Sequence, residues 1–293
     1  MAPQVSVISG KFRQENITKA LKLIEDDIRQ KITRKKRVVI KPNLGFIHST
    51  LANTQAEAVE ALLEFLRQFY QPKITIAEGT TIGETSDGFR QYGYNKLVEK
   101  FNVKLVDLNK DSYQDIEIYD GRLNPTVTVG LSETILKSDF IISICPIKTH
   151  DSVIVTLGIK NLAVGAICRP DRNKIHTGPK AINLTLAKIA PKVWPDLTVL
   201  DGFEAMEGDG PVDGEKVNFQ VVVAGCDALA TDTLTTILMG FKPSEVGYLT
   251  YLKDKNLGCG DPLRIAVRGD NWRKLIRRFK PHHLYQQQLD WQI

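Results

Sequence analysis

The sequence predicts an α/β fold in which a mostly parallel sheet carries helices on both faces. Short apolar segments rich in β-branched residues alternate along the chain with segments of helical periodicity. The apolar segments are hydrophobic almost without interruption, which is typical of strands that are buried on both faces. A length of 293 residues fits one large α/β domain or two lobes.

The first half of the chain is expected to alternate strands and helices in regular order. Asn16 is expected to cap a helix whose apolar residues lie on one stripe from Ile17 to Ile28. Thr54 and Glu57 fit the capping box of the next long helix. We expect strands at residues 4–9, 37–41, 73–79, 104–108 and 140–146, and a short antiparallel pair near 115–119 and 126–129.

The second half is expected to add three strands and at least three helices. Asp227 is expected to cap a helix that runs to about Met239. Apolar residues between Trp272 and Phe279 recur at helical spacing with basic residues between them, which predicts a last amphipathic helix over 271–279. Further strands are expected at 197–202, 219–225 and 264–269, and a further helix at 243–255. We therefore divide the chain into an α/β domain, residues 1–240, and a helical extension packed on it, residues 241–293.

The composition is that of a globular protein. Hydrophobic residues make up 42% and charged residues 25% of the chain, and these values do not fit a disordered protein. The amino terminus lacks the apolar run of a secretory signal, and no apolar stretch is long enough to span a bilayer. We therefore expect a cytoplasmic protein without a transmembrane segment.

The formal charge of +5 arises from one segment near the carboxyl end. The rest of the chain is close to neutral, which argues against a protein that binds nucleic acid over its whole surface. The basic segment contains Arg264, Arg268, Arg273, Lys274, Arg277, Arg278 and Lys280, and a single acidic residue, Asp270.

Four cysteines lie far apart in the sequence, and no two of them form a CxxC pair. Their spacing fits neither a zinc ribbon nor a ferredoxin-type cluster. We therefore expect reduced thiols packed as small apolar groups, no iron–sulfur cluster encoded by the chain itself, and a colourless protein after purification in air. The cysteines are Cys145, Cys168, Cys226 and Cys259.

Five predicted strands end in polar or charged residues. Ligands of open parallel sheets bind beyond the carboxyl ends of the strands, where loops and helix amino termini converge. Any single strand end could be a solvated loop, but five at one edge predict a shared cleft. The strand ends carry Lys41 with Asn43, Glu78, Asp107, Lys148 with His150, and Asp201.

The stretch 145–176 gathers cationic residues around glycines. Lys148 and His150 are two residues apart, so their side chains project to the same side of an extended segment. Lys160 and Asn161 follow a glycine that allows close approach of the backbone. Arg169, Arg172 and His176 then follow in a proline-containing loop.

These residue types suit a small anion. Lysine, arginine and asparagine bind carboxylate or phosphate through charge-assisted hydrogen bonds, and histidine moves a proton near neutral pH. The alternative is a basic surface loop with one buried lysine paired to an acid. We predict catalytic roles for His150, His176 and Lys148, and ligand-binding roles for Lys41, Asn43, Glu78, Lys160, Asn161 and Arg169.

A glycine-rich acidic stretch, residues 201–214, provides candidate metal ligands. Its glycines allow tight turns that can aim several carboxylates at one point, and clustered carboxylates suit Mg²⁺ or Mn²⁺. A flexible acidic loop, or salt bridges to the basic stretch, is the alternative. The predicted metal ligands are Asp201, Glu207, Asp209 and Asp232.

At these residues the chain resembles the family catalogued as domain of unknown function 362. The likeness runs in order from about residue 37 to residue 240. Members often carry a ferredoxin-type tail with two four-iron clusters, which implies redox work, but this sequence has only Cys259 after residue 240. The resemblance therefore implies a separate ferredoxin as a candidate partner. The matching pieces are KPNL at 41–44, AEG at 77–79, KTH at 148–150, GIKNLAVG at 158–165, His176, DGFEAMEGDGPVDG at 201–214 and DALATD at 227–232.

One loop also resembles a motif of nickel-pincer lactate racemases. In those enzymes a lysine holds the cofactor and histidines exchange the substrate proton. The likeness covers Gly158, Lys160, Gly165 and His176. Because the likeness is confined to this loop, we do not infer from it that this chain binds the nickel-pincer cofactor.

Three functions are consistent with the sequence. The leading hypothesis is an enzyme that acts on a small anionic metabolite, with help from a divalent metal such as Mg²⁺. The second is a redox or cofactor-assembly accessory protein whose separate partner supplies the iron–sulfur clusters. The third is a protein that binds an anionic surface or nucleic acid through its basic carboxyl-terminal helix.

Overall fold

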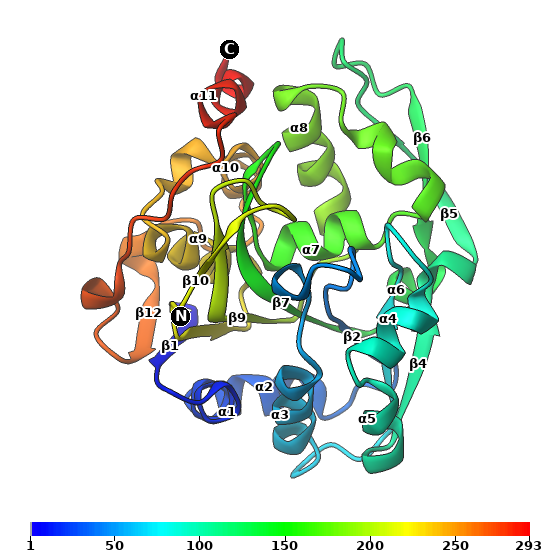
Figure 1. The fold of residues 1–293 in the computed structure, drawn as a ribbon, viewed down its shortest axis with the longest axis vertical. Coiled ribbons are helices and arrows are strands. Elements are labelled where there is room, and N and C mark those ends of the chain that lie inside the picture. The colour runs from blue at the N-terminus through cyan, green and yellow to red at the C-terminus, as the bar shows by residue number, and fades with distance from the viewer. Residues whose placement is uncertain (1) are drawn as a thin grey trace.

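The computed structural model describes residues 2–293 and contains a ten-stranded mixed sheet with helices on both faces (Figure 1). Five of the seven neighbouring pairs along its main path are parallel, and only the pairs of β11 with β1 and with β9 are antiparallel. The prediction of a mostly parallel sheet is confirmed. The main path runs through β12 (Ala266–Gly269), β1 (Gln4–Ser9), β11 (Val221–Gly225), β9 (Leu197–Glu207), β7 (Phe140–His150), β2 (Val38–Lys41), β3 (Ile74–Glu78) and β4 (Val103–Asp107).

Two short strands extend the long central strands beyond the main path. β8 (Ile154–Thr156) turns back on β7, and β10 (Glu215–Val217) turns back on β9. A separate antiparallel pair is formed by β5 (Tyr113–Ile118) and β6 (Val127–Ser132). The predicted antiparallel pair in this region is therefore confirmed.

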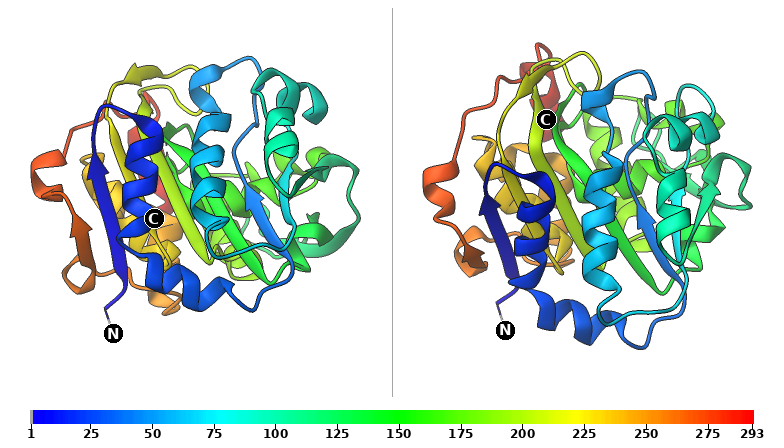
Figure 2. Two further views of the ribbon diagram at one scale, coloured as in Figure 1. Left: turned by 90° about the horizontal axis from the view of Figure 1, so that it is seen from below. Right: turned by 60° about the horizontal axis from the view of Figure 1, so that its bottom comes forward.

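Helices cover both faces of the sheet, as the sequence predicts (Figure 2). One face packs on the amino-terminal helices, and the opposite face packs on the helices that follow β8. The first set is α1 (Arg13–Lys22), α2 (Glu25–Ile32), α3 (Ala56–Leu66), α4 (Thr85–Gln91) and α5 (Asn95–Lys100). The second set is α7 (Gly158–Gly165), α8 (Pro179–Ile189), α9 (Ala228–Leu238) and α10 (Gly247–Asp254). Two short helices, α6 (Glu133–Leu136) and α11 (Tyr285–Gln288), complete the set.

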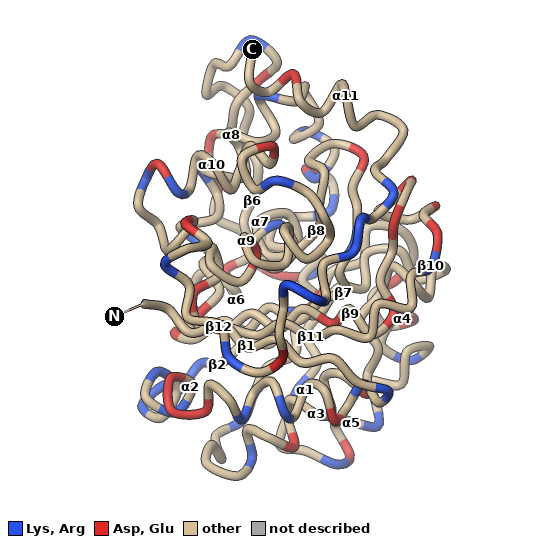
Figure 3. The backbone as a smooth tube through the Cα atoms, turned by 90° about the vertical axis from the view of Figure 1, so that its left-hand side faces the viewer, with Lys and Arg blue, Asp and Glu red and all other residues tan. Residues whose placement is uncertain are grey.

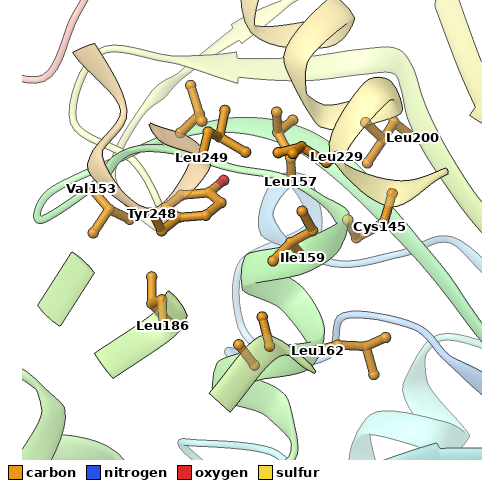
Figure 4. Close-up of a cluster of buried hydrophobic side chains, with 14 of the residues drawn as sticks. Cys145, Val153, Leu157, Ile159, Leu162, Leu186, Leu200, Leu229, Tyr248 and Leu249 are labelled. Atoms are coloured by element: carbon orange, nitrogen blue, oxygen red, sulfur yellow. The ribbon is translucent and has the colours of Figure 1, made fainter. Parts of the chain in front are cut away.

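The sheet separates two hydrophobic cores. Along β7, Ile142 and Ile144 face the core beneath α1 to α3, whereas Ile141 and Cys145 face the core beneath α7 to α10. This alternation explains why β7 is apolar without interruption. Residues of the second core that gather around α7 (Figure 4) include Leu157, Ile159, Leu162, Leu200, Leu229, Tyr248 and Leu249.

Two predicted helix caps are wrong, because both side chains bind backbone carbonyls outside their own helix instead. Asn16 lies inside α1, and its amide donates to the carbonyl of Gly10 at 2.8 Å. The Thr54 hydroxyl donates to the carbonyl of Ile144 at 3.0 Å and thereby ties the start of α3 to β7. The cap predicted at Asp227 is confirmed, since its carboxylate accepts from the backbone N–H of Ala230 at 2.9 Å.

The amphipathic helix predicted over 271–279 is also wrong. Only one 3₁₀ turn forms there, at Trp272–Leu275. Beyond this turn the backbone N–H groups of Arg277 and Phe279 donate to the carbonyls of Leu238 and Met239 at the end of α9. These bonds replace the bonds that a continued helix would make. The strand predicted at 264–269 is present as β12, which returns to the main sheet beside β1.

Basic and acidic residues are interspersed over α1, α2 and α3 (Figure 3). In the carboxyl-terminal segment, Lys280 is paired with Glu215 at 2.6 Å. No helix within residues 2–293 is both long enough and apolar enough to cross a membrane.

Candidate functional site

A cavity of about 790 Å³, including its open mouth, lies beyond the carboxyl ends of β2, β3 and β7. β2 ends at Lys41, which pairs with Ser143, so β7 continues past this edge and carries its last residues over the cavity. Eight of the nine predicted catalytic and ligand-binding residues line this one cavity. They are Lys41, Asn43, Glu78, Lys148, His150, Lys160, Asn161 and His176.

Lys41 is neutralised by an acid on the neighbouring strand. Its Nζ atom lies 2.7 Å from Oε2 of Glu78, and both side chains are buried. The carboxylate of Glu78 also accepts from the backbone N–H groups of Leu44 and Gly79. Burial lowers the pKa of Lys41, and the negative charge of Glu78 opposes this shift. Lys41 therefore fits the alternative of a buried lysine paired to an acid.

Lys148 is buried without such a partner. Its Nζ atom donates to the carbonyl of Ala52 at 2.7 Å, and within residues 2–293 no carboxylate forms an ion pair with it. Burial, followed by the charge of Lys160, lowers the pKa of Lys148 to about 7. Lys148 thus changes its charge near neutral pH.

Lys160 and His150 form a close pair in the wall of the cavity. Nζ of Lys160, in the first turn of α7, lies 2.6 Å from Nε2 of His150. Burial lowers the pKa of Lys160 to about 8, while burial and then the charge of Lys160 lower the pKa of His150 to about 3. At pH 7 the amine therefore carries the shared proton and the imidazole accepts it. The other ring nitrogen, Nδ1, faces the carboxylate of Asp151 at 3.0 Å at the half-buried rim.

Asp232 fixes the start of the helix that carries Lys160. Its buried carboxylate accepts from the backbone N–H groups of Gly158 at 3.0 Å and Ile159 at 2.9 Å. Burial raises the pKa of Asp232 to about 7, although these two hydrogen bonds oppose the shift. The acid predicted as a metal ligand therefore caps α7.

Asn43 and Asn161 hold the strand ends together. The Nδ2 atom of Asn43 donates to Oδ1 of Asn161 at 3.0 Å. Nδ2 of Asn161 in turn donates to the hydroxyl of Ser143 and to the carbonyl of Lys41. The two amides thus link β2, β7 and α7 around the floor of the cavity.

His176 lies at the exposed rim. Its Nδ1 atom is 3.3 Å from the hydroxyl of Ser152, and it lines the same cavity as Lys160 and His150. Burial of the ring, followed by the charge of Lys160, lowers the pKa of His176.

Of the two arginines in this loop, Arg172 lines the cavity and Arg169 does not. Arg169 is not among the residues that line the cavity, because its guanidinium is turned to the carbonyls of Thr81 and Gly83. Arg172, three residues on, is buried in the wall and donates to the carbonyl of Gly79 at 2.6 Å. Spacing alone did not distinguish these two arginines, since both lie in the same short 3₁₀ helix.

Thr156 on β8 is a further cavity residue that sequence reasoning missed. Its Oγ1 atom is buried and has no hydrogen-bond partner within the described part of the chain. No sequence pattern marked it, because a single threonine in a short strand is ordinary. A buried hydroxyl without a partner costs free energy, on the order of 1–3 kcal/mol.

The structure does not bring the four predicted metal ligands together. Asp201 is buried against Arg13 at 2.9 Å, and Asp232 caps α7. Glu207 accepts from the backbone N–H of Lys280. Within residues 2–293, the one set of His, Cys, Asp or Glu side chains close enough to share an ion is Asp209 with His282 and His283, none of which lines the cavity.

The cavity therefore carries an excess of buried positive charge. Glu78 compensates Lys41, but Lys148, Lys160 and Arg172 form no ion pair with any carboxylate of the described residues 2–293. Buried like charges repel one another and are destabilising unless an anion compensates them. The arrangement is suited to a small anion and a proton transfer beside it.

The chain is similar to known proteins in sequence and in structure. A thylakoid-associated protein of Synechocystis sp., named sll1697, is 25% identical over 219 residues, which cover 72% of this chain. The chain spans 65% of the length of that relative. Among solved structures, the lactate racemase apoprotein from Thermoanaerobacterium thermosaccharolyticum matches 77% of this chain and 54% of its own, with a TM-score of 0.48 and 15% identity.

The residues that build the cavity and its supporting contacts, from Lys41 to Asp232, all lie in the segment of the chain that matches one sequence-family model. Its model matches residues 38–236, which is most of the chain. The chain belongs to the family described as domain of unknown function (DUF362).

Proposed function

We propose that the chain is an enzyme that binds a small anion, a carboxylate or a phosphate, in the cationic cavity. One observation carries this proposal: three buried basic side chains, Lys148, Lys160 and Arg172, form no ion pair with any carboxylate among the described residues. A ligand with one or two negative charges would remove the repulsion between them. The buried hydroxyl of Thr156 provides a further polar group in the same wall.

The pair of Lys160 and His150 gives the proposed enzyme a group that moves a proton. A general acid or base works best when its pKa lies near the working pH, and the pKa of Lys160, about 8, meets this requirement. The amine can donate its proton to a bound ligand. The neutral imidazole accepts a hydrogen bond from the protonated amine at 2.6 Å, and this bond favours return of the proton to the amine afterwards. Lys148 and Arg172 would hold and orient the anion beside this pair.

The proposal is tested by measuring the melting temperature of the protein with and without sulfate, phosphate, acetate and oxalate. An anion that binds the folded state stabilises it by RT ln(1 + c/Kd), where c is the anion concentration, so the melting temperature rises with the logarithm of that concentration once it exceeds the dissociation constant. We expect at least one of these anions to raise it, and we expect Lys148→Met and Lys160→Met to lose that rise.

Lys22→Met is the matched control, since Lys22 is exposed on α1 and loses the same charge. It should keep the full rise. The proposal fails if none of the four anions stabilises the protein, or if Lys22→Met weakens the effect as much as the cavity variants do.

A further inference from the structure

We propose that the natural ligand is longer than its anionic head, and that its mainly apolar end lies in a second hollow closed by the carboxyl-terminal segment. This inference rests on the proposed function, because it concerns the same ligand. The second hollow encloses about 490 Å³, including its open part. It shares Asp151 and His176 with the cationic cavity, so the two hollows meet at one rim.

Three apolar residues, Pro179, Ile182 and Leu284, line the second hollow. Ile182 of α8 is 1% exposed, and Leu284 at the start of α11 is half-buried. Pro179 lies in the first turn of α8. A hydrocarbon group of a few carbons would be removed from water between these side chains.

The same hollow also offers a hydrogen-bond acceptor. Gln288 is 3% exposed, and its Nε2 atom donates to the carbonyls of His150 and Asp151, both at 2.8 Å. Its Oε1 atom is buried without a partner among residues 2–293. A carboxamide held in this way has its oxygen free for a donor, such as a hydroxyl or an amide N–H of a ligand, after a small shift of the side chain.

The segment that closes the hollow is firmly anchored. Trp291 donates from Nε1 to the carbonyl of Glu245 at 2.7 Å and packs edge-on against Tyr251 at 5.4 Å. α11 is therefore held over the rim by contacts outside the hollow. The chemistry of the two hollows together fits a short amphiphilic acid, with a charged head, a donor group near the middle and an apolar end.

The test uses two chain-length series, acetate, butyrate and hexanoate, and methyl, butyl and hexyl phosphate, measured by calorimetric titration of the full chain. We expect affinity to rise along the series that binds, by roughly threefold per methylene group buried. Leu284→Ser should reduce the ratio of the longest to the shortest affinity at least fivefold, because it removes part of the apolar wall. Leu263→Ser is the matched control, since Leu263 is 90% exposed and lies outside both hollows. It should keep the ratio of the wild type.

Two failures are distinguishable. If the short anions bind but affinity does not rise with chain length, or Leu284→Ser keeps the full ratio, the second hollow is not part of the ligand site, whereas the proposed function stands. If neither series binds at any length, the proposal for the second hollow is overturned, and the proposed function falls with it only if sulfate, phosphate and oxalate also fail to stabilise the protein. Far-ultraviolet circular dichroism and melting of Leu284→Ser show whether the variant is folded before its affinities are compared.

Discussion

The Nζ atom of Lys160 and the Nε2 atom of His150 lie 2.6 Å apart, and only one proton fits between them. The pKa of the amine, lowered by burial to about 8, exceeds that of the imidazole, lowered to about 3. The proton therefore resides on Lys160 at neutral pH, and the pair bears one positive charge. Lys148, with a pKa of about 7, is the second titrating cation in the same cavity.

Anion binding is therefore expected to weaken as the pH rises. Between pH 6 and pH 9 first Lys148 and then Lys160 lose their protons, and each neutral amine offers the anion no charge. We expect the affinity for sulfate, which keeps its own charge over this range, to fall roughly 10- to 100-fold. Isothermal titration calorimetry at several pH values measures this change.

The Lys148→Met variant is the control for this profile. It removes the group that titrates near pH 7, so its affinity should be lower at pH 6 and should depend less steeply on pH. A wild-type affinity that stays constant from pH 6 to pH 9 would contradict the assignment of these two lysines as the groups that bind the anion.

Loss of charge should lower the free energy of unfolding at Lys41 but not at Lys148. Lys41→Met leaves the buried carboxylate of Glu78 without its partner, and breaking a buried pair costs about 3–5 kcal/mol. Lys148→Met removes a buried cation that forms no ion pair within the described residues, at the loss of one hydrogen bond to Ala52. We expect its free energy of unfolding to change by no more than about 1 kcal/mol, or to increase. Urea denaturation of both variants measures the difference.

The pH dependence of stability provides a check on Lys148. Its folded-state pKa, about 7, lies below its ordinary value of 10.5, so between these values the unfolded chain binds the extra proton. Burial of the charged amine is destabilising, so the free energy of unfolding rises as the pH increases from 7 to 10.5 and falls again as the pH decreases through this window. The difference in unfolding free energy between Lys148→Met and the wild type should be largest near pH 7 and should shrink toward pH 10. A difference independent of pH would contradict the shifted pKa.

Gly165 is expected to accept no side chain. A Cβ atom at this position would lie 2.5 Å from Cε and 2.7 Å from Nζ of Lys41, which is too close for any real contact. Gly165→Ala should push Lys41 away from Glu78 and lower the unfolding free energy by roughly 1–3 kcal/mol. Gly45→Ala is the control, since its nearest contact would be an ordinary 3.7 Å. Equal losses in the two variants, measured by denaturation, would disprove this explanation.

The position of the site could be predicted from the sequence because it depends on strand ends. Lys41 is the last residue of β2 and Lys148 lies near the end of β7, and parallel strands in one sheet deliver their last residues to the same edge. The long distance between these residues along the chain does not matter for this argument. The same reasoning places Glu78 at the end of β3.

The partners of each side chain could not be predicted in this way. Asp232 caps α7 and Thr54 binds the carbonyl of Ile144, and both contacts join segments far apart in the sequence. Local spacing carries no information on such contacts, so Asp232 was assigned to a metal and Thr54 to its own helix. The sequence names both Arg169 and Arg172 in this loop but does not tell which one binds a ligand, because only the tertiary fold turns one of them into the cavity.

The carboxyl-terminal segment should be required for stability although it forms no long helix. Phe279 is 4% exposed and packs edge-on against Phe219 at 5.2 Å, and Trp291 is 7% exposed. Removing residues 270–293 uncovers both contacts, and losing one buried aromatic side chain alone costs about 3–5 kcal/mol. We expect the truncated protein to melt at a clearly lower temperature than the full chain, by differential scanning calorimetry. Trp291→Ala should reproduce part of this loss, whereas Ile293→Ala, at a residue that is 88% exposed, should leave the melting temperature unchanged. A truncated protein that melts like the full chain would instead favour a basic segment that serves to dock on an anionic surface, since its removal would then expose no part of the core.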